Sequence, residues 1–90
     1  MQSRLTVDNE TSEFATVLEI SCLDETGILY RITRAFTELD LDIVSARVQT
    51  LGSEVIDAFY IRDQSGNKIE DPEHLAEIEL AVLRWIDMDL

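Results

Sequence analysis

Residues 16–23 alternate between apolar and polar side chains, which is the pattern of a β-strand with one buried face. The face expected to be buried carries Leu18, Ile20 and Cys22. Residues 4–8 can form a shorter strand, and residues 9–13 form a polar turn between the two. The pattern therefore predicts a short N-terminal strand that leads straight into the first core strand.

The hydrophobic period changes to that of a helix at Gly27. Apolar side chains then recur on one side of the predicted helix: Ile28, Leu29, Ile32, Ala35, Phe36 and Leu39. Arg31, Arg34 and Glu38 fall mostly on the other side, and Asp24 or Thr26 can cap the helix. A strand that feeds a helix in this way leaves free backbone N–H groups at the helix start. Such a turn can hold a small anionic or zwitterionic molecule.

The second half of the chain predicts a β-hairpin followed by a helix. Residues 41–50 and 55–62 are rich in strand formers, and the pair Gly52-Ser53 supplies the turn between them. In one hairpin register Arg47 and Asp57 face each other. Asp71 and Pro72 then mark a helix start. Its apolar side is Leu75, Ile78, Val82, Trp85 and Ile86.

The order strand, helix, strand, strand, helix predicts an α+β fold of the ferredoxin-like class. We expect a βαββα(β) sandwich in which an antiparallel four-stranded sheet carries two helices on one face. The chain ends before a last strand, so we expect the N-terminal strand to take that strand's place. Residues 1–90 then form a single domain, with residues 4–8 as the lead-in strand and residues 16–88 as the core.

Charge excludes several kinds of partner. The chain has 19 acidic and 7 basic residues, a net charge of −12, and no stripe of Lys or Arg. Binding to nucleic acid or to an anionic membrane surface depends on such a stripe, so we expect neither. No apolar run is long enough to span a bilayer or to act as a signal peptide, and we expect a cytoplasmic protein. The single Cys22 forbids an internal disulfide, and nothing suggests a cofactor, a metal site or catalytic residues.

A family resemblance extends over residues 16–73 and their lead-in. It rests on five segments in this order: RLTVDNETS, ILYRITRAF, DIVSARVQTLG, VIDAFYIRD and GNKIEDPE. Together they resemble an ACT domain, and more narrowly they are similar to the C-terminal ACT domain of the bacterial PII uridylyltransferase/uridylyl-removing enzymes. The resemblance implies a regulatory domain of a nitrogen regulator that senses an amino acid, with glutamine as the expected ligand. It also implies that the catalytic sites lie on a part of the parent protein not present here.

The resemblance implies a ligand site between two domains, formed by the loop after the first core strand and the start of the second. The residues at those positions are Cys22, Asp24, Glu25, Thr26, Gly27, Ile28, Leu29 and Asp42. The family commonly has Arg-Pro-Gly where this chain has Glu25-Thr26-Gly27, and often Asn where it has Asp42. An acidic rim of Asp24, Glu25, Asp40 and Asp42 would attract an ammonium group and repel a carboxylate, which the N–H groups near Gly27 can still hold.

Two other functions remain open at this point. If both helices cover the opposite face, Val55, Phe59 and Ile61 form an exposed apolar face for another copy or a sister ACT domain; in the alternative register they form the core. A protein-interaction or dimerisation module without a ligand is therefore the second hypothesis. An acylphosphatase-like enzyme is the third, and it is disfavoured because residues 24–27 contain no Arg to hold phosphate.

Overall fold

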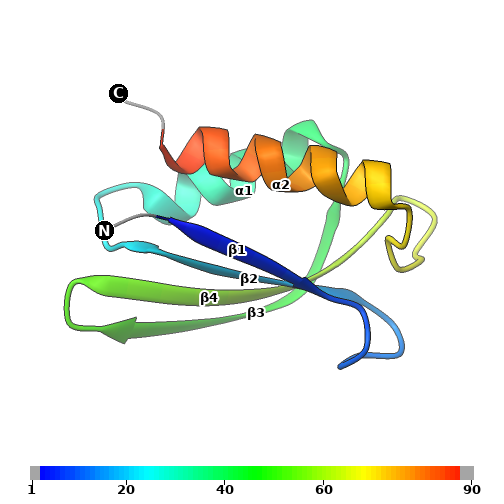
Figure 1. Ribbon diagram of the computed structural model, residues 1–90, viewed down its shortest axis with the longest axis horizontal. Helices are drawn as coiled ribbons and strands as arrows, with labels where there is room; N and C mark the ends of the chain where they lie inside the picture. Colours follow the sequence, from blue (N-terminus) through cyan, green and yellow to red (C-terminus); the bar gives the residue numbers. More distant parts are fainter. Residues whose placement is uncertain (1–2, 88–90) are drawn as a thin grey trace.

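The computed structural model describes residues 3–87 and has two layers, a twisted sheet and a pair of helices on one of its faces (Figure 1). The elements follow in the order β1 (Arg4–Asp8), β2 (Thr16–Leu23), α1 (Ile28–Glu38), β3 (Asp42–Leu51), β4 (Glu54–Arg62) and α2 (Pro72–Ile86). The predicted order of elements is confirmed. Met88, the last residue of the predicted core, lies outside the described residues.

The sheet has the strand order β1-β2-β4-β3, and every neighbouring pair is antiparallel. β1 pairs with β2 from Arg4 opposite Ser21 to Asp8 opposite Val17. The N-terminal strand thus occupies the sheet position expected for the missing last strand, and the predicted ferredoxin-like architecture is confirmed. The strand β3 forms the other edge of the sheet.

The core lies between the helices and the face of the sheet that carries Leu18, Ile20 and Cys22. In β2–β4 pairing, Leu18 is opposite Phe59, and the ring of Phe59 meets that of Phe36 from α1 edge to face at 5.1 Å. Val55, Phe59 and Ile61 are therefore buried beneath the helices. The prediction that these three form an exposed interface is wrong, and the alternative register, in which they belong to the core, is the one observed.

The hairpin register separates the predicted pair of charges. Arg47 is opposite Ala58, whereas Asp57 is opposite Val48 and Ile20. Neighbouring residues of a strand point to opposite faces, so Arg47 lies on the open face and Asp57 on the face covered by the helices. The predicted cross-strand contact between Arg47 and Asp57 is wrong.

The two helix starts differ in how they are capped. Asp71 caps α2 as predicted, because its side chain accepts a hydrogen bond from the N–H of Glu73 over 3.1 Å. At α1 the N-cap residue is Gly27 itself, without a side-chain cap, so the predicted capping by Asp24 or Thr26 is wrong. The backbone turns there through φ 78°, a left-handed conformation that glycine adopts without steric cost.

Candidate functional site

The loop between β2 and α1 is held by backbone hydrogen bonds and still presents unused donors. The N–H of Asp24 donates to the carbonyl of Ser53 over 2.9 Å, and that of Ile28 donates to the carbonyl of Glu25 over 3.1 Å. Five other N–H groups have no hydrogen-bond partner within residues 3–87: those of Glu25, Thr26, Gly27, Leu29 and Tyr30. The first turn of α1 can therefore donate to an anionic group.

A buried arginine anchors this loop. Arg31 is 6% exposed, although its sequence position predicted the polar side of the helix. Its Nη2 lies 3.0 Å from Oε2 of Glu25, and its Nη1 donates to the carbonyl of Ile86 over 3.1 Å. Because Glu25 is engaged in this ion pair, its carboxylate is partly neutralised and the loop is joined to the end of α2.

The predicted ligand residues of the loop divide into two groups. Cys22 and Ile28 are buried in the core, and burial, followed by the charge of Asp57, raises the pKa of the Cys22 thiol to about 11. That thiol stays protonated and unreactive at neutral pH. The remaining loop residues are exposed: Asp24, Glu25, Thr26, Gly27 and Leu29. Cys22 and Ile28 thus pack the loop against the core, and only the exposed residues are accessible to a ligand.

Asp42 lies far from the rest of the predicted site. β2 ends with Leu23 opposite Glu54, beside the β3–β4 turn, whereas Asp42 is opposite Arg62 at the other end of β3. The 10 residues of β3 span about 30 Å at about 3.3 Å per residue. Within one chain a small molecule cannot contact both Gly27 and Asp42. Asp40 lies near Asp42, so the predicted acidic rim does not form within one chain.

Asp57 is a buried carboxylate that the sequence analysis did not select as a site residue. It is 0% exposed, and neither carboxylate oxygen has a hydrogen-bond partner within residues 3–87. Burial, followed by the charge of Asp24, raises the pKa of this carboxyl group to about 6. The sequence did contain a signal for this buried carboxylate. Asp57 alternates with Val55 and Phe59 and therefore shares their face of β4, which the sequence analysis assigned to an interface.

The edge strand β3 is uncovered. All of its ten residues are exposed, and Val44, Val48 and Leu51 are about half exposed. Long edge strands with few charges offer unpaired N–H and C=O groups to a further strand. Arg47 is the single charge between Asp42 and Leu51. The exposed apolar side chains of the sheet thus lie along its β3 edge and not on β4.

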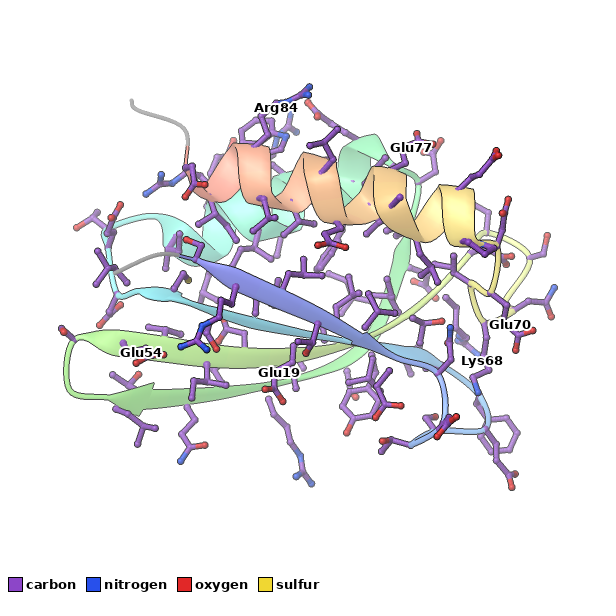
Figure 2. The ribbon with its side chains drawn as sticks, viewed as in Figure 1. Glu19, Glu54, Lys68, Glu70, Glu77 and Arg84 are labelled. Atoms are coloured by element: carbon purple, nitrogen blue, oxygen red, sulfur yellow. The ribbon has the colours of Figure 1, made fainter. Side chains whose placement is uncertain are left out.

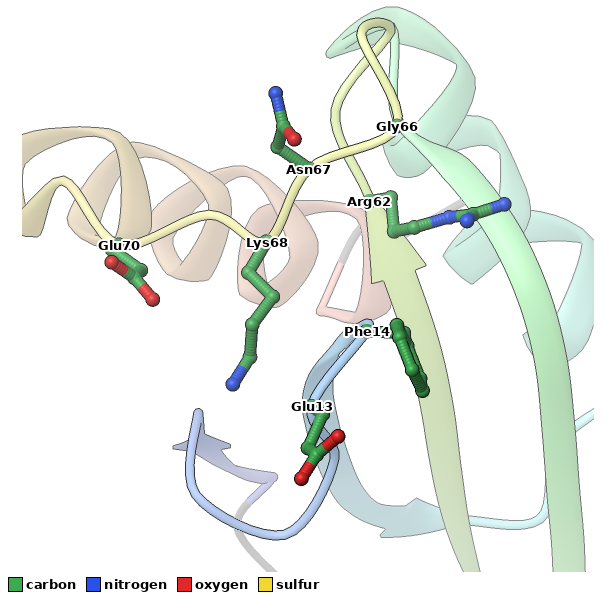
Figure 3. Close-up of a pocket in the computed structure, with 7 residues that line it drawn as sticks. All are labelled: Glu13, Phe14, Arg62, Gly66, Asn67, Lys68 and Glu70. Atoms are coloured by element: carbon green, nitrogen blue, oxygen red, sulfur yellow. The ribbon is translucent and has the colours of Figure 1, made fainter.

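A cavity lies at the end of the sheet opposite the Gly27 loop. It has a volume of about 380 Å³ and lies between the β1–β2 loop and the β4–α2 loop (Figure 3). Its lining residues are Glu13, Phe14, Arg62, Gly66, Asn67, Lys68 and Glu70. None of them was predicted as a site residue, because the two loops are separated by about fifty positions in sequence. We call this cavity the Arg62 pocket.

The described part of the chain offers no obvious centre for metal chemistry. Within residues 3–87 no group of three or more His, Cys, Asp or Glu side chains is placed to hold a metal ion. None of the described helices has the length and apolar character needed to cross a bilayer. The strand order and the two helices on one face define a ferredoxin-like α+β domain with exposed donors at the start of α1.

The family is given by comparison with known proteins. The pattern of the ACR9-like, ACT-like domain matches residues 4–86. The chain belongs to this family of ACT-like domains. The crystal structure of an unknown protein from Galdieria sulphuraria has the same fold, with a TM-score of 0.58 and 17% identity over 73% of this chain and 37% of that one.

Relatives with higher identity are bifunctional uridylyltransferase/uridylyl-removing enzymes. The protein from Rhodospirillum rubrum is 46% identical over 88% of this chain, and that from Azospirillum brasilense is 41% identical over 89%. The protein from Bradyrhizobium sp. (strain BTAi1) is 38% identical over 99% of this chain. The chain spans only 8 to 10% of the length of these relatives. Together with the family match over residues 4–86, this places the chain as one small ACT-like regulatory domain of a much longer protein.

Proposed function

We propose that this chain is the amino-acid-sensing domain of a cytoplasmic nitrogen regulator of the PII uridylyltransferase type, and that its ligand is glutamine. The ligand binds at an interface between two ACT domains and changes the activity of an enzyme to which the domain is attached. The observation that carries the proposal is the turn at Gly27, where unused N–H groups and acidic side chains lie side by side.

The chemistry of the loop suits a zwitterion. The α-carboxylate accepts hydrogen bonds from the free N–H groups of the first turn of α1, where the helix dipole also favours negative charge. The α-ammonium group faces the exposed carboxylate of Asp24. Glu25 is paired with Arg31, and the positive charge of Arg31 reduces the repulsion between the Glu25 carboxylate and the ligand carboxylate.

A second domain is needed to complete the site. Asp42 and the Gly27 loop lie at opposite ends of the sheet. Asp42 can therefore contact a ligand bound at Gly27 only when it comes from a neighbouring domain. Antiparallel pairing of two β3 edges would bring the start of one strand to the end of the other. The exposed Val44, Val48 and Leu51 support this edge as the contact, either with another copy or with a sister ACT domain in the same parent chain.

A ligand held across such an interface acts by shifting a population. It binds the paired arrangement better than the separated one, and each tenfold preference supplies about 1.4 kcal/mol toward the paired state. The attached enzyme then responds to the arrangement of its regulatory domains and not to a change within one domain.

Calorimetric titration with L-glutamine and other amino acids tests this proposal. We expect heat of binding with glutamine, and we expect the substitutions Gly27→Glu and Asp42→Ala each to reduce it. Glu79→Ala on the exposed side of α2 is the matched control and should bind normally. Absence of heat with every amino acid, in a protein that retains both ACT domains, would exclude the proposed function.

The exposed β3 edge also favours a second candidate, a protein-interaction module that binds no ligand. In that case the edge holds an assembly together without a small molecule. Two substitutions separate the candidates. If Gly27→Glu leaves regulation unchanged while Val48→Lys abolishes assembly, the interaction module is the correct function.

A further inference from the structure

The face of the sheet that points away from the helices carries no helix of the described chain (Figure 1). Its middle is apolar and half-buried, and charged side chains surround that middle. The apolar side chains are those of Ile56, Ala58 and Tyr60 on β4. The charged side chains are those of Arg4, Glu19, Arg47 and Glu54. An apolar middle with a polar margin is the arrangement of a protein–protein interface. We call this surface the open face.

The four charges of the open face have no ion-pair partner in their own chain. The ion pairs found within residues 3–87 are Arg31–Glu25 and Arg62–Asp42, and neither includes one of the four. Two arginines and two glutamates also sum to zero, on a chain whose net charge is −12. Two copies of the chain therefore repel each other less when they meet through this face than through the more acidic rest of the surface.

Glu19 and Arg47 lie in one row across the sheet with a small residue between them. Ala58 on β4 is opposite Glu19 on β2 and also opposite Arg47 on β3. The two charges are two strand spacings apart, which is about 10 Å. Glu19 projects from the side of the sheet away from the helices (Figure 2). The row thus holds an acid and a base on either side of a small residue.

The surface between these two charges is hollowed. The hollow has a volume of about 460 Å³ and is lined by Glu19, Arg47, Val48, Gln49, Ile56 and Ala58. Because Ala58 has only a methyl group, a long side chain from a facing surface can enter between the acid and the base.

A two-fold axis parallel to the strands makes this row complementary to itself. Rotation about such an axis, placed between two stacked sheets, exchanges β2 with β4 and β1 with β3, and each residue keeps its level along the strands. Glu19 of one copy then lies over Ala58 of the second copy, next to the Arg47 of that second copy. The same rotation forms the contact a second time with the roles of the copies exchanged. Stacked sheets lie about 10 Å apart, a gap that side chains of both sheets fill together.

The size of the open face fits a weak dimer. Four strands about 4.8 Å apart, each contributing about eight residues at about 3.3 Å, give a face of about 19 by 27 Å. Two stacked copies would bury about 1,000 Å² in total, which is the lower limit for a specific interface. The association should therefore depend on concentration, with monomers in dilute solution.

We propose that the open face is an interface between two copies of this chain, stacked face to face, in which Glu19 of each copy pairs with Arg47 of the other. The proposal does not depend on the proposed function, because it uses no residue of the Gly27 loop and no ligand. It also differs from pairing of two β3 edges, which joins the backbones of the strands and not the faces of the sheets.

Sedimentation equilibrium of the 90-residue chain without any added amino acid tests the interface. We expect dimers with a dissociation constant on the order of 100 µM, as suits an interface of this size. Glu19→Arg and Arg47→Glu should each weaken the dimer about tenfold, because like charges then face each other. The double variant restores opposite charges and should associate within about threefold of the native chain.

Two matched controls separate the contact from the effect of total charge. Glu79→Arg and Arg84→Glu make the same changes of charge at exposed positions on α2, away from the open face. Neither should weaken the dimer. Val48→Lys, which disturbs the β3 edge, should also leave it unchanged. ¹H–¹⁵N NMR spectra of the dilute variants show whether the fold is intact, and the amide signals of Ile56 and Ala58 should shift as the native chain is concentrated.

Three results would overturn the proposal. They are a strict monomer at millimolar concentration, single charge reversals that act no differently from the α2 controls, and a double variant that fails to restore the dimer. If dimers form only with glutamine and are lost in Val48→Lys, the copies meet through the β3 edge. The open face is then excluded, whereas the proposed function is supported. Dimers that form without glutamine and obey the charge exchange establish the open face whatever the ligand does.

Discussion

The guanidinium group of Arg31 lies 3.0 Å from the carboxylate of Glu25 and connects the loop before α1 to the interior of the domain. Through its other terminal nitrogen the same side chain donates to the carbonyl of Ile86, at the end of α2. Three segments therefore meet at one side chain: the loop, α1 and the end of α2. Displacement of the loop by a ligand would alter the support of both helices.

Replacing Arg31 should destabilise the domain more than replacing its partner. Arg31→Met removes hydrogen bonds of a charged group that is 6% exposed, and we expect a loss of about 1.5–3 kcal/mol in the free energy of unfolding. The carboxylate of Glu25 is half exposed, so we expect Glu25→Gln to cost about 0.2–1 kcal/mol. Urea unfolding of both variants measures the difference. Equal losses would contradict the anchoring role of Arg31.

Asp57 should make the domain less stable as the pH rises from about 4 to 6. The pKa of its carboxyl group is raised to about 6 in the folded state, from 3.8. An acid with a raised pKa binds its proton more tightly in the folded chain, so the stabilisation is complete below pH 3.8 and is lost as the pH rises through 6. A shift of about two units corresponds to about 3 kcal/mol.

Asp57→Val tests this pH effect, because valine matches the apolar neighbours Ile20 and Val48. We expect the variant to be more stable than the native chain above pH 6, and the difference between them to shrink as the pH falls toward 4. Thermal unfolding across this range measures the difference. Glu77→Gln, at an exposed position on α2 (Figure 2), is the control and should leave the pH profile unchanged. A profile unaffected by Asp57→Val would disprove the assignment.

Gly27→Ala should cost about 1–2 kcal/mol of stability. The residue has φ 78°, which is unfavourable for a residue with a Cβ, and an added Cβ would meet no atom within 4 Å. The cost is therefore backbone strain alone. Gly27→Asn should cost less, because Asn tolerates the left-handed conformation better than Ala. Chemical denaturation of the two variants gives the order, and a loss as large for Asn as for Ala would indicate a steric clash instead.

Thr16→Val should loosen the junction between the two loops of the Arg62 pocket. Valine keeps the shape of threonine but leaves the N–H of Ile69 without its acceptor in a buried position. We expect a loss of about 1–3 kcal/mol in the free energy of unfolding. Thr37→Val, at an exposed helical position, should change stability by less than about 0.5 kcal/mol. Faster amide hydrogen exchange at Ile69 would locate the effect.

Much of the fold could be predicted because local signals agreed with each other. Alternation placed Leu18, Ile20 and Cys22 on one buried face, and Asp71 with Pro72 marked the start of α2 correctly. The pattern of residues 4–8, the polar turn at residues 9–13 and the open slot in the expected fold together predicted the position of the N-terminal strand in the sheet. In each case the signal lay in neighbouring residues of the sequence, and tertiary contacts did not override it.

The candidate site was harder to predict because it depends on contacts between distant segments. β4 is apolar at Val55, Phe59 and Ile61 and also at Ile56 and Tyr60, so its pattern does not say which face the helices cover. Arg31 is buried because its head group meets Glu25 and Ile86, a relationship that helical spacing does not contain. The Arg62 pocket joins two loops whose proximity only the folded sheet creates.

Sedimentation velocity of the 90-residue chain, with and without L-glutamine, tests most directly whether the ligand is held between two domains. A ligand that binds only the paired state shifts the equilibrium toward that state by mass action. We expect glutamine to convert monomer to dimer, and we expect Val48→Lys on the β3 edge to abolish the shift. Identical sedimentation with and without saturating glutamine would contradict the account.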